Sequence, residues 1–179
     1  MDVTLAFVND PLGLPYPSID SPDQIRHEYI DLRETPEKID ELPELKDLPA
    51  FKEAIRSLNA PTSLFRTLGC EKHFSDYGSQ RQLGAYIDLA YAEWENNSDL
   101  FQFYILIGEF ARSCRDVDLP SAQIRFELFK YEFHETGKQG WKATIKIGAF
   151  GPDDAAATAT WTQALNLLVN FVSGIRQRD

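Results

Sequence analysis

Two long stretches of the chain repeat one order of patterns, and this repeat limits the fold more than any other feature of the sequence. In each stretch a strand-like segment, a turn with glycine, a second strand-like segment and a helix follow one another. The strands are expected near 64–75 and 82–94, and again near 122–135 and 140–150. Because a short glycine turn between two strands is typical of a hairpin, the repeat predicts two ββα units.

The helices of the two units are expected near 98–115 and 153–176, where apolar residues recur at helical spacing. The first stripe consists of Leu100, Phe103, Tyr104, Ile107, Phe110, Ala111 and Cys114. The second stripe consists of Trp161, Ala164, Leu165, Leu168, Val172 and Ile175. Residues at the centres of the stripes should be almost fully buried, and these are Phe103, Phe110, Trp161 and Leu168.

The strands are polar on one side, which is typical of a sheet that is covered on one face only. In the strand near 122–135 the apolar phase changes by one residue, and this predicts a β-bulge near Leu128 and Phe129. The predicted fold is therefore α+β, a two-layer sandwich. It has an antiparallel sheet of about four strands, with two long helices on one face.

Residues 1–60 differ from residues 61–179, which form the predicted α+β domain. The first 60 residues hold seven of the ten prolines, with 13 acidic and 6 basic groups. Proline fixes φ and removes a hydrogen-bond donor, so only short helices are expected there, beginning at Ser21, Thr35 and Pro49. The apolar residues in 3–17 predict an extended strap, which either covers the core of the α+β domain or docks onto a partner.

The predicted order of elements is a leading helix followed by two strand–strand–helix units in an acidic chain. In this order of elements, and only in this respect, the chain resembles the secretion-chaperone-like fold. The resemblance concerns topology, and a fold does not determine a function.

Charge and motifs exclude several classes of function. The net charge of -10 argues against nucleic acid as a partner, since phosphate binding needs clustered lysine and arginine. No apolar run is long enough to span a membrane, and the N-terminus lacks the basic start of a secretory signal, so a cytoplasmic protein is expected. Phosphate-loop, lipase and zincin motifs are absent, so no cofactor is expected. The two cysteines should be buried, inert thiols.

Seven acidic residues fall between positions 31 and 47, and this density suggests a surface that faces a basic protein partner. The candidate binding residues are Glu37, Glu41 and Glu44. The alternative is a solvated acidic surface that only aids solubility.

A second candidate surface is the polar face of the sheet, with Tyr86, Arg125, Lys142 and Lys146. These side chains either pair across strands with Glu127 and Asp88, or they bind an acidic peptide, which could be the protein's own acidic, proline-rich N-terminal segment of residues 1–60.

Glu71-Lys72-His73 and Glu132-Phe133-His134 end the first strand of each unit. Both Glu-x-His pairs are expected on the polar face of the sheet. If they converge, Glu71, His73, Glu132 and His134 could bind a metal ion or supply a general base. The alternative is two separate solvated pairs.

Two hypotheses for the function follow. The first is a non-catalytic protein-binding module, such as an adaptor, a chaperone-like protein or an inhibitor-like protein. The alternative is a small metal- or ligand-dependent enzyme that uses the paired Glu-x-His sites. The sequence leaves the formation of a homodimer open.

Overall fold

A computed structural model describes residues 1–14, 19–21, 24–26, 29–133 and 137–175. The strands of the main sheet are β1 (Asp2–Leu14), β4 (Phe65–Tyr77), β5 (Gln80–Tyr91), β6 (Ala122–Phe133) and β7 (Lys138–Gly151). A separate pair of strands consists of β2 (Ile19–Ser21) and β3 (Gln24–Arg26). The helices are α1 (Pro49–Leu58), α2 (Trp94–Asn97), α3 (Leu100–Ser113) and α4 (Asp154–Gly174), and two 3-10 turns are η1 (Pro36–Glu41) and η2 (Pro43–Leu45).

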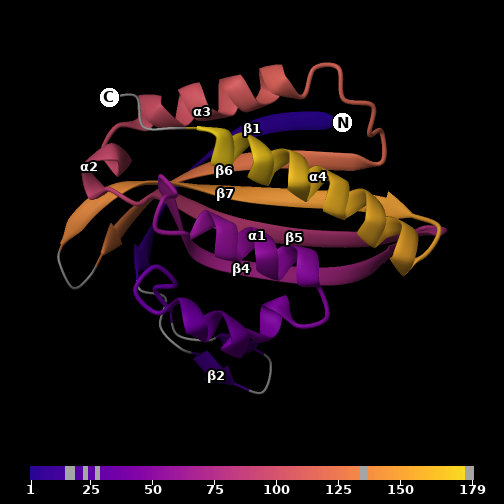
Figure 1. Cartoon of the computed structure of the whole chain (residues 1–179), viewed down its shortest axis with the longest axis horizontal. Helices are drawn as coiled ribbons and strands as arrows, with labels where there is room; N and C mark the ends of the chain where they lie inside the picture. Colours follow the sequence, from indigo (N-terminus) through magenta and orange to yellow (C-terminus); the bar gives the residue numbers. More distant parts are fainter. Residues whose placement is uncertain (15–18, 22–23, 27–28, 134–136, 176–179) are drawn as a thin grey trace.

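The main sheet is mixed and has the strand order β1-β6-β7-β5-β4 (Figure 1). The fold is thus α+β, as predicted. The four predicted antiparallel strands are present as β4, β5, β7 and β6, but the sheet is larger than expected, since β1 adds a fifth strand that runs parallel to β6. This pairing joins residues more than a hundred positions apart, and a local sequence pattern carries no information about it.

β1 is the segment that the sequence predicts as an extended strap. Its register against β6 shifts between Val8 and Leu12, so Asn9, Asp10 and Pro11 form an irregularity in the strand. A proline cannot donate to a ladder and is tolerated at an edge strand or a bulge. The extended conformation is confirmed for residues 3–14, which lie in the sheet, while the last three residues of the predicted strap lie outside the described residues.

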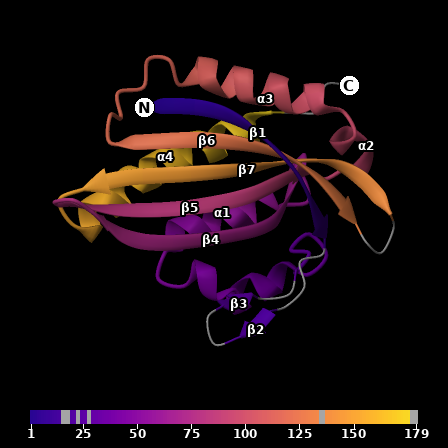
Figure 2. The same cartoon turned by 180° about the vertical axis from the view of Figure 1, so that it is seen from behind.

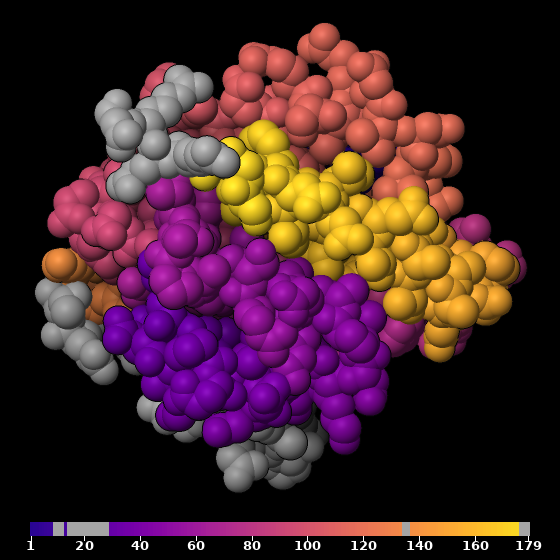
Figure 3. Space-filling model, in the orientation of Figure 1, coloured from indigo at the N-terminus to yellow at the C-terminus, as the bar shows by residue number. Residues whose placement is uncertain are grey.

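Helices α1 and α4 cover one face of the sheet, and α3 runs along its β1 edge (Figures 1 and 2). Figure 3 shows α4 and the segment before β4 side by side on the covered face. Phe103, Phe110 and Trp161 are fully buried and Leu168 is 1% exposed, which confirms the predicted centres of the stripes.

The predicted stripe of α3 is too wide. Tyr104 and Ala111 are exposed, whereas Leu106 is buried beside Phe103 and Phe110. A helix at the edge of a sheet buries a narrower face than a helix at its centre.

The predicted bulge near Leu128 and Phe129 is wrong, because the pairing of β6 with β7 is continuous. The first half of β6 buries the side chains that face the helices. In its second half Tyr131, on the opposite face, is buried against Leu68 and Ala90. The apparent change of phase in the sequence therefore comes from a second, small apolar cluster, which Tyr29, Trp94 and Phe133 also join.

The short helices before β4 are only partly as predicted. Helix α1 begins at Pro49, and the 3-10 turn η1 begins at Pro36. The helix expected from Ser21 does not begin there, because Ser21 ends β2 and pairs with Gln24 of β3. Serine and proline favour turns as well as helix starts, so the local signal was ambiguous.

Both cysteines are free thiols, with Cys114 buried and Cys70 half-buried. Burial raises the pKa of the Cys70 thiol to about 12. The thiol is therefore protonated at neutral pH, which fits the predicted lack of reactivity. Leu68 and Cys70 point to opposite faces because the register of β4 shifts between Thr67 and Gly69.

We expect Cys70 to make the stability of the protein fall at alkaline pH. A raised pKa in the folded state stabilises the fold below the unfolded value of 9.0, and this contribution is lost as the pH rises toward about 12. Between pH 9 and 11 the free energy of unfolding of the wild type should fall more steeply than that of Cys70→Ala. Urea denaturation at several pH values measures both slopes, and equal slopes would contradict the assignment.

Candidate functional site

Figure 2 shows the polar face of the sheet, which lies away from α1 and α4. Three of the predicted binding residues lie in register across this face. Lys146 is paired with Tyr86 on one side and with Arg125 on the other, so the three side chains form a row across β5, β7 and β6. Arg125 and Lys146 are exposed, and Tyr86 is half-buried.

The two exposed cations share one carboxylate. The Arg125 Nε lies 3.0 Å from Glu127 Oε1, and the Lys146 Nζ lies 2.9 Å from Glu127 Oε2. Glu127 is only 7% exposed. This is the cross-strand pairing that the sequence predicts as the alternative to peptide docking, and it neutralises part of the charge that an acidic peptide would need.

Lys142 forms a buried ion pair on the same face. Its Nζ lies 2.6 Å from Asp88 Oδ2, and both side chains are almost fully buried. Thr144 bridges the pair, accepting from Lys142 at 3.2 Å and donating to Asp88 at 2.5 Å. Burial lowers the pKa of Lys142 from its usual value, and the nearby Asp88 carboxylate offsets this lowering only in part. Lys142 is thus part of the interior and is not accessible to a partner.

The three acidic candidates differ in exposure. Glu37 and Glu41 are exposed on η1. Glu44 is half-buried in η2, and its Oε2 is buried without a hydrogen-bond partner among the described residues. Glu37 and Glu41 can therefore meet a partner, whereas a change at Glu44 would also disturb the packing of the chain.

Beside these carboxylates lies a groove of about 560 Å³, which we call the acidic groove. It is lined by Tyr29, Ile30, Asp31, Glu34, Thr35, Lys38, Glu41 and Leu42. Ile30 and Leu42 are half-buried and pack against the core, so the lining combines an apolar part with three carboxylates and one ammonium group.

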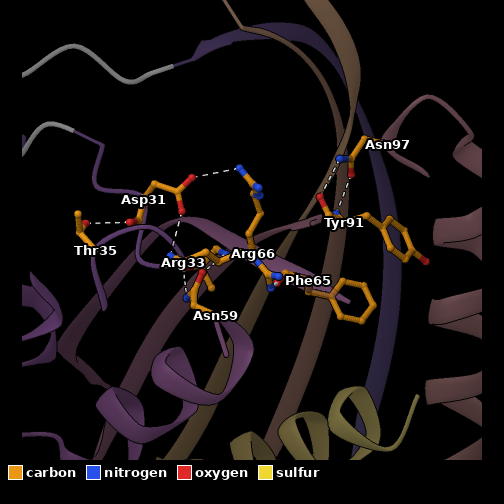
Figure 4. A network of polar contacts seen from close by, with 9 residues as sticks. Asp31, Arg33, Thr35, Asn59, Phe65, Arg66, Tyr91 and Asn97 are labelled. Atoms are coloured by element: carbon orange, nitrogen blue, oxygen red, sulfur yellow. Dashed lines mark hydrogen bonds and ion pairs between the residues drawn. The ribbon is translucent and has the colours of Figure 1, made fainter. Parts of the chain in front are cut away.

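A network of hydrogen bonds fixes the wall of the acidic groove (Figure 4). Asp31 accepts from the Arg66 Nη1 at 3.1 Å, from the Arg33 backbone N–H at 2.9 Å and, through its carbonyl, from Thr35. The Arg33 guanidinium in turn donates to the carbonyl oxygens of Ala60, Pro61, Ser63 and Phe65. These contacts tie the groove to the start of β4.

Of the three carboxylates that line the acidic groove, the sequence singled out only Glu41 as a binding residue, and it gave no sign of the groove itself. No sequence pattern marks the other lining residues Tyr29, Ile30 and Leu42, because they come together only when the irregular chain around η1 folds back. Asp31 and Glu34 were predicted only as members of the acidic stretch between positions 31 and 47.

The two Glu-x-His pairs lie on different strands. Glu71 and His73 are exposed on the polar face of β4, where the imidazole covers Gly84 of β5 closely. Glu132 alternates with Tyr131 on β6 and therefore points to the other face, where its carboxylate accepts from Gln139 at 3.0 Å. β5 and β7 separate the two strands.

His134 lies outside the described residues. Within the described part of the chain, no group of three or more histidine, cysteine, aspartate or glutamate side chains is placed to hold a metal ion. The expectation that both pairs share the polar face is thus corrected for Glu132.

Comparison of the chain with protein-family models, curated proteins and solved structures finds no match. Among the described residues, none of the helices has both the length and the apolar character that crossing a membrane requires.

Proposed function

We propose that the protein is a non-catalytic protein-binding module that receives a basic segment of a partner protein in the acidic groove. The observation that carries the proposal is the lining of the groove, in which Asp31, Glu34 and Glu41 stand around a partly apolar surface. A hydrogen-bond network holds one of these carboxylates in place, so the groove is formed before a partner arrives.

The chemistry of the groove suits a lysine or arginine side chain. Such a side chain has an aliphatic stem that packs on apolar surface and a charged head that seeks a carboxylate. Ile30 and Leu42 can contact the stem, and Glu34 and Glu41 can contact the head. Tyr29 also lines the groove and adds to its apolar part.

The charge around the groove supports the same class of partner. Residues 1–60 carry a net charge of -7, and Glu37 and Asp40 are exposed close to the groove in the sequence. Such a field attracts a basic segment over roughly a Debye length, about 8 Å at physiological salt. The rate of association should consequently decrease as the salt concentration rises.

We expect the double substitution Glu34→Lys and Glu41→Lys to weaken binding of a lysine- and arginine-rich peptide by roughly tenfold, since each exposed ion pair is worth up to about 1 kcal/mol and reversal adds repulsion. Both carboxylates are exposed, so the thermal midpoint should change little. Fluorescence anisotropy with a labelled peptide at low and at physiological salt measures the change. Glu44 is left intact because its side chain is half-buried.

The matched control is Asp116→Lys with Asp118→Lys, which changes the net charge by the same amount at two exposed loop positions. A groove that binds the peptide predicts a much smaller loss in this control. Equal losses in the two variants would show that only the net charge attracts the peptide, and the groove would then not be the binding site.

A further inference from the structure

The largest group of exposed apolar side chains lies at the opposite edge of the sheet from the acidic groove. In the described chain, this group consists of Leu5, Phe7, Phe101, Tyr104 and Ile105, which are between 39% and 64% exposed. The rings of Phe7 in β1 and Tyr104 in α3 are 5.6 Å apart, so the strand and the helix contribute to one surface. We call these five residues the α3–β1 patch.

Helix α3 has a second apolar stripe on its outer side. Phe103, Ile107 and Phe110 face the core, whereas Phe101 and Ile105 recur at helical spacing on the exposed side. Residues 100–108 contain no charged side chain, although 26% of the chain is charged. A surface helix normally carries its charges on the side away from the core, so this helix is apolar where solvent alone would favour polar residues.

Gly108 continues the outer stripe, seven residues after Phe101. A glycine inside a helix costs roughly 1 kcal/mol relative to alanine. A Cβ placed on Gly108 would meet no atom of the described residues within 4 Å, so none of their contacts requires a glycine there. A helix surface without a side chain lets the backbone of a second helix approach closely. The position therefore indicates contact with something outside the chain.

We propose that the α3–β1 patch is the interface of a homodimer in which α3 packs against α3 of a second copy. The two helices would cross near Ile105 and Gly108, and Phe7 would contact the flank of the other helix. A two-fold axis brings the same patch of each copy together, so an uncharged apolar stripe is complementary to itself.

The distribution of charge favours a second copy at this edge. The acidic stretch packs near β4, while β1 is the strand at the other edge of the sheet (Figure 1). Contact through the α3–β1 patch keeps the two acidic regions far apart, so the net charge of -10 on each copy opposes association least there. The acidic groove stays accessible in such a dimer, and the inference does not depend on the proposed function.

Light scattering and sedimentation of the full chain over a range of concentrations test the proposal. The wild type should show a concentration-dependent mass that approaches twice 20.4 kDa. Ile105→Glu places two like charges opposite each other at the two-fold axis, so this variant should stay monomeric. The matched control Tyr77→Glu changes a residue that is 65% exposed on the β4–β5 hairpin, and it should dimerise like the wild type.

Gly108→Gln separates an interface from a merely exposed helix. The site has open space, and glutamine is a better helix former than glycine, so the thermal midpoint of the monomer should rise. Dimerisation should nevertheless weaken at least tenfold, because the side chain holds the helices apart. A wild type that stays monomeric up to sub-millimolar concentration overturns the proposal and leaves the patch to a different protein. A dimer that neither Ile105→Glu nor Gly108→Gln affects overturns it as well.

Discussion

Replacement of Phe110 by alanine should lower the free energy of unfolding by about 3–5 kcal/mol. The Phe110 side chain is fully buried, and its ring lies 5.6 Å from that of Phe126 in β6 and 5.4 Å from that of Phe171 in α4. The residue thus joins the sheet to two helices. Removal of the ring costs both the transfer of its apolar surface and the cavity that remains between three elements.

Urea denaturation measured at high dilution checks this value. The control is Phe101→Ala on the same helix, because Phe101 is 64% exposed and its truncation removes little buried surface. In the monomer the control should lose well under 1 kcal/mol, within the range of ordinary surface substitutions. A loss below about 0.5 kcal/mol for Phe110→Ala would contradict the assigned orientation of α3.

Local periodicity in the sequence predicted the parts of this fold that depend on local contacts. The stripe around Trp161 and Leu168 fits α4 because a helix repeats its environment every few residues. Tyr104 was misplaced because the period defines an apolar side of the helix but does not define how much of that side the sheet covers. Where α3 lies at the edge of the sheet, the pattern predicts more burial than the structure has.

The position of β1 could not be predicted in the same way. Its apolar residues indicated an extended segment, and an extended segment can lie on a surface or join a sheet. The choice depends on whether the edge of β6 is free, which is a property of residues more than a hundred positions away. The same limit applies to Tyr131, whose burial depends on Leu68 and Ala90 in two other strands.

For the candidate site, the sequence predicted which charged side chains pair with each other, but it did not predict how deeply each pair is buried. The pairing of the cations of the polar face with Glu127 and Asp88 follows from strand alternation, and the structure has these pairs. Alternation does not predict that one pair is buried and another exposed. That difference arises because aromatic residues crowd one end of the polar face and leave the other end open.

The two interaction surfaces that we propose lie at opposite edges of one sheet. The acidic groove is built by the chain that precedes β4, and the α3–β1 patch is built by the strand and helix at the far side (Figure 1). A dimer through the patch would therefore present two grooves pointing away from each other. Two linked sites raise the effective affinity for a partner that carries two basic segments.

Lys142→Met should reduce the free energy of unfolding by about 3–5 kcal/mol, because it leaves the buried Asp88 carboxylate without its cation. The ammonium group lies 2.6 Å from Asp88, and the Lys142 side chain is only 1% exposed, so water cannot replace it without a rearrangement. Urea denaturation of the single variant measures the loss. The matched control is Lys146→Met on the same strand and the same face, whose exposed partnership with Glu127 should be worth under about 1 kcal/mol.

A second substitution distinguishes the loss of the pair from the loss of packing. If the cost comes from an uncompensated charge, Lys142→Met combined with Asp88→Leu should recover much of the stability, since an apolar pair can replace a buried ion pair at little cost.

Burial also lowers the pKa of Lys142 below its unfolded value of 10.5, so the unfolded chain binds the proton more tightly. The stability of the wild type relative to Lys142→Met should therefore rise with pH between the lowered pKa and 10.5. A double variant as unstable as the single one, together with a flat pH difference, would mean that Lys142 stabilises the sheet through its aliphatic stem and its contact with the Phe129 ring rather than through its charge.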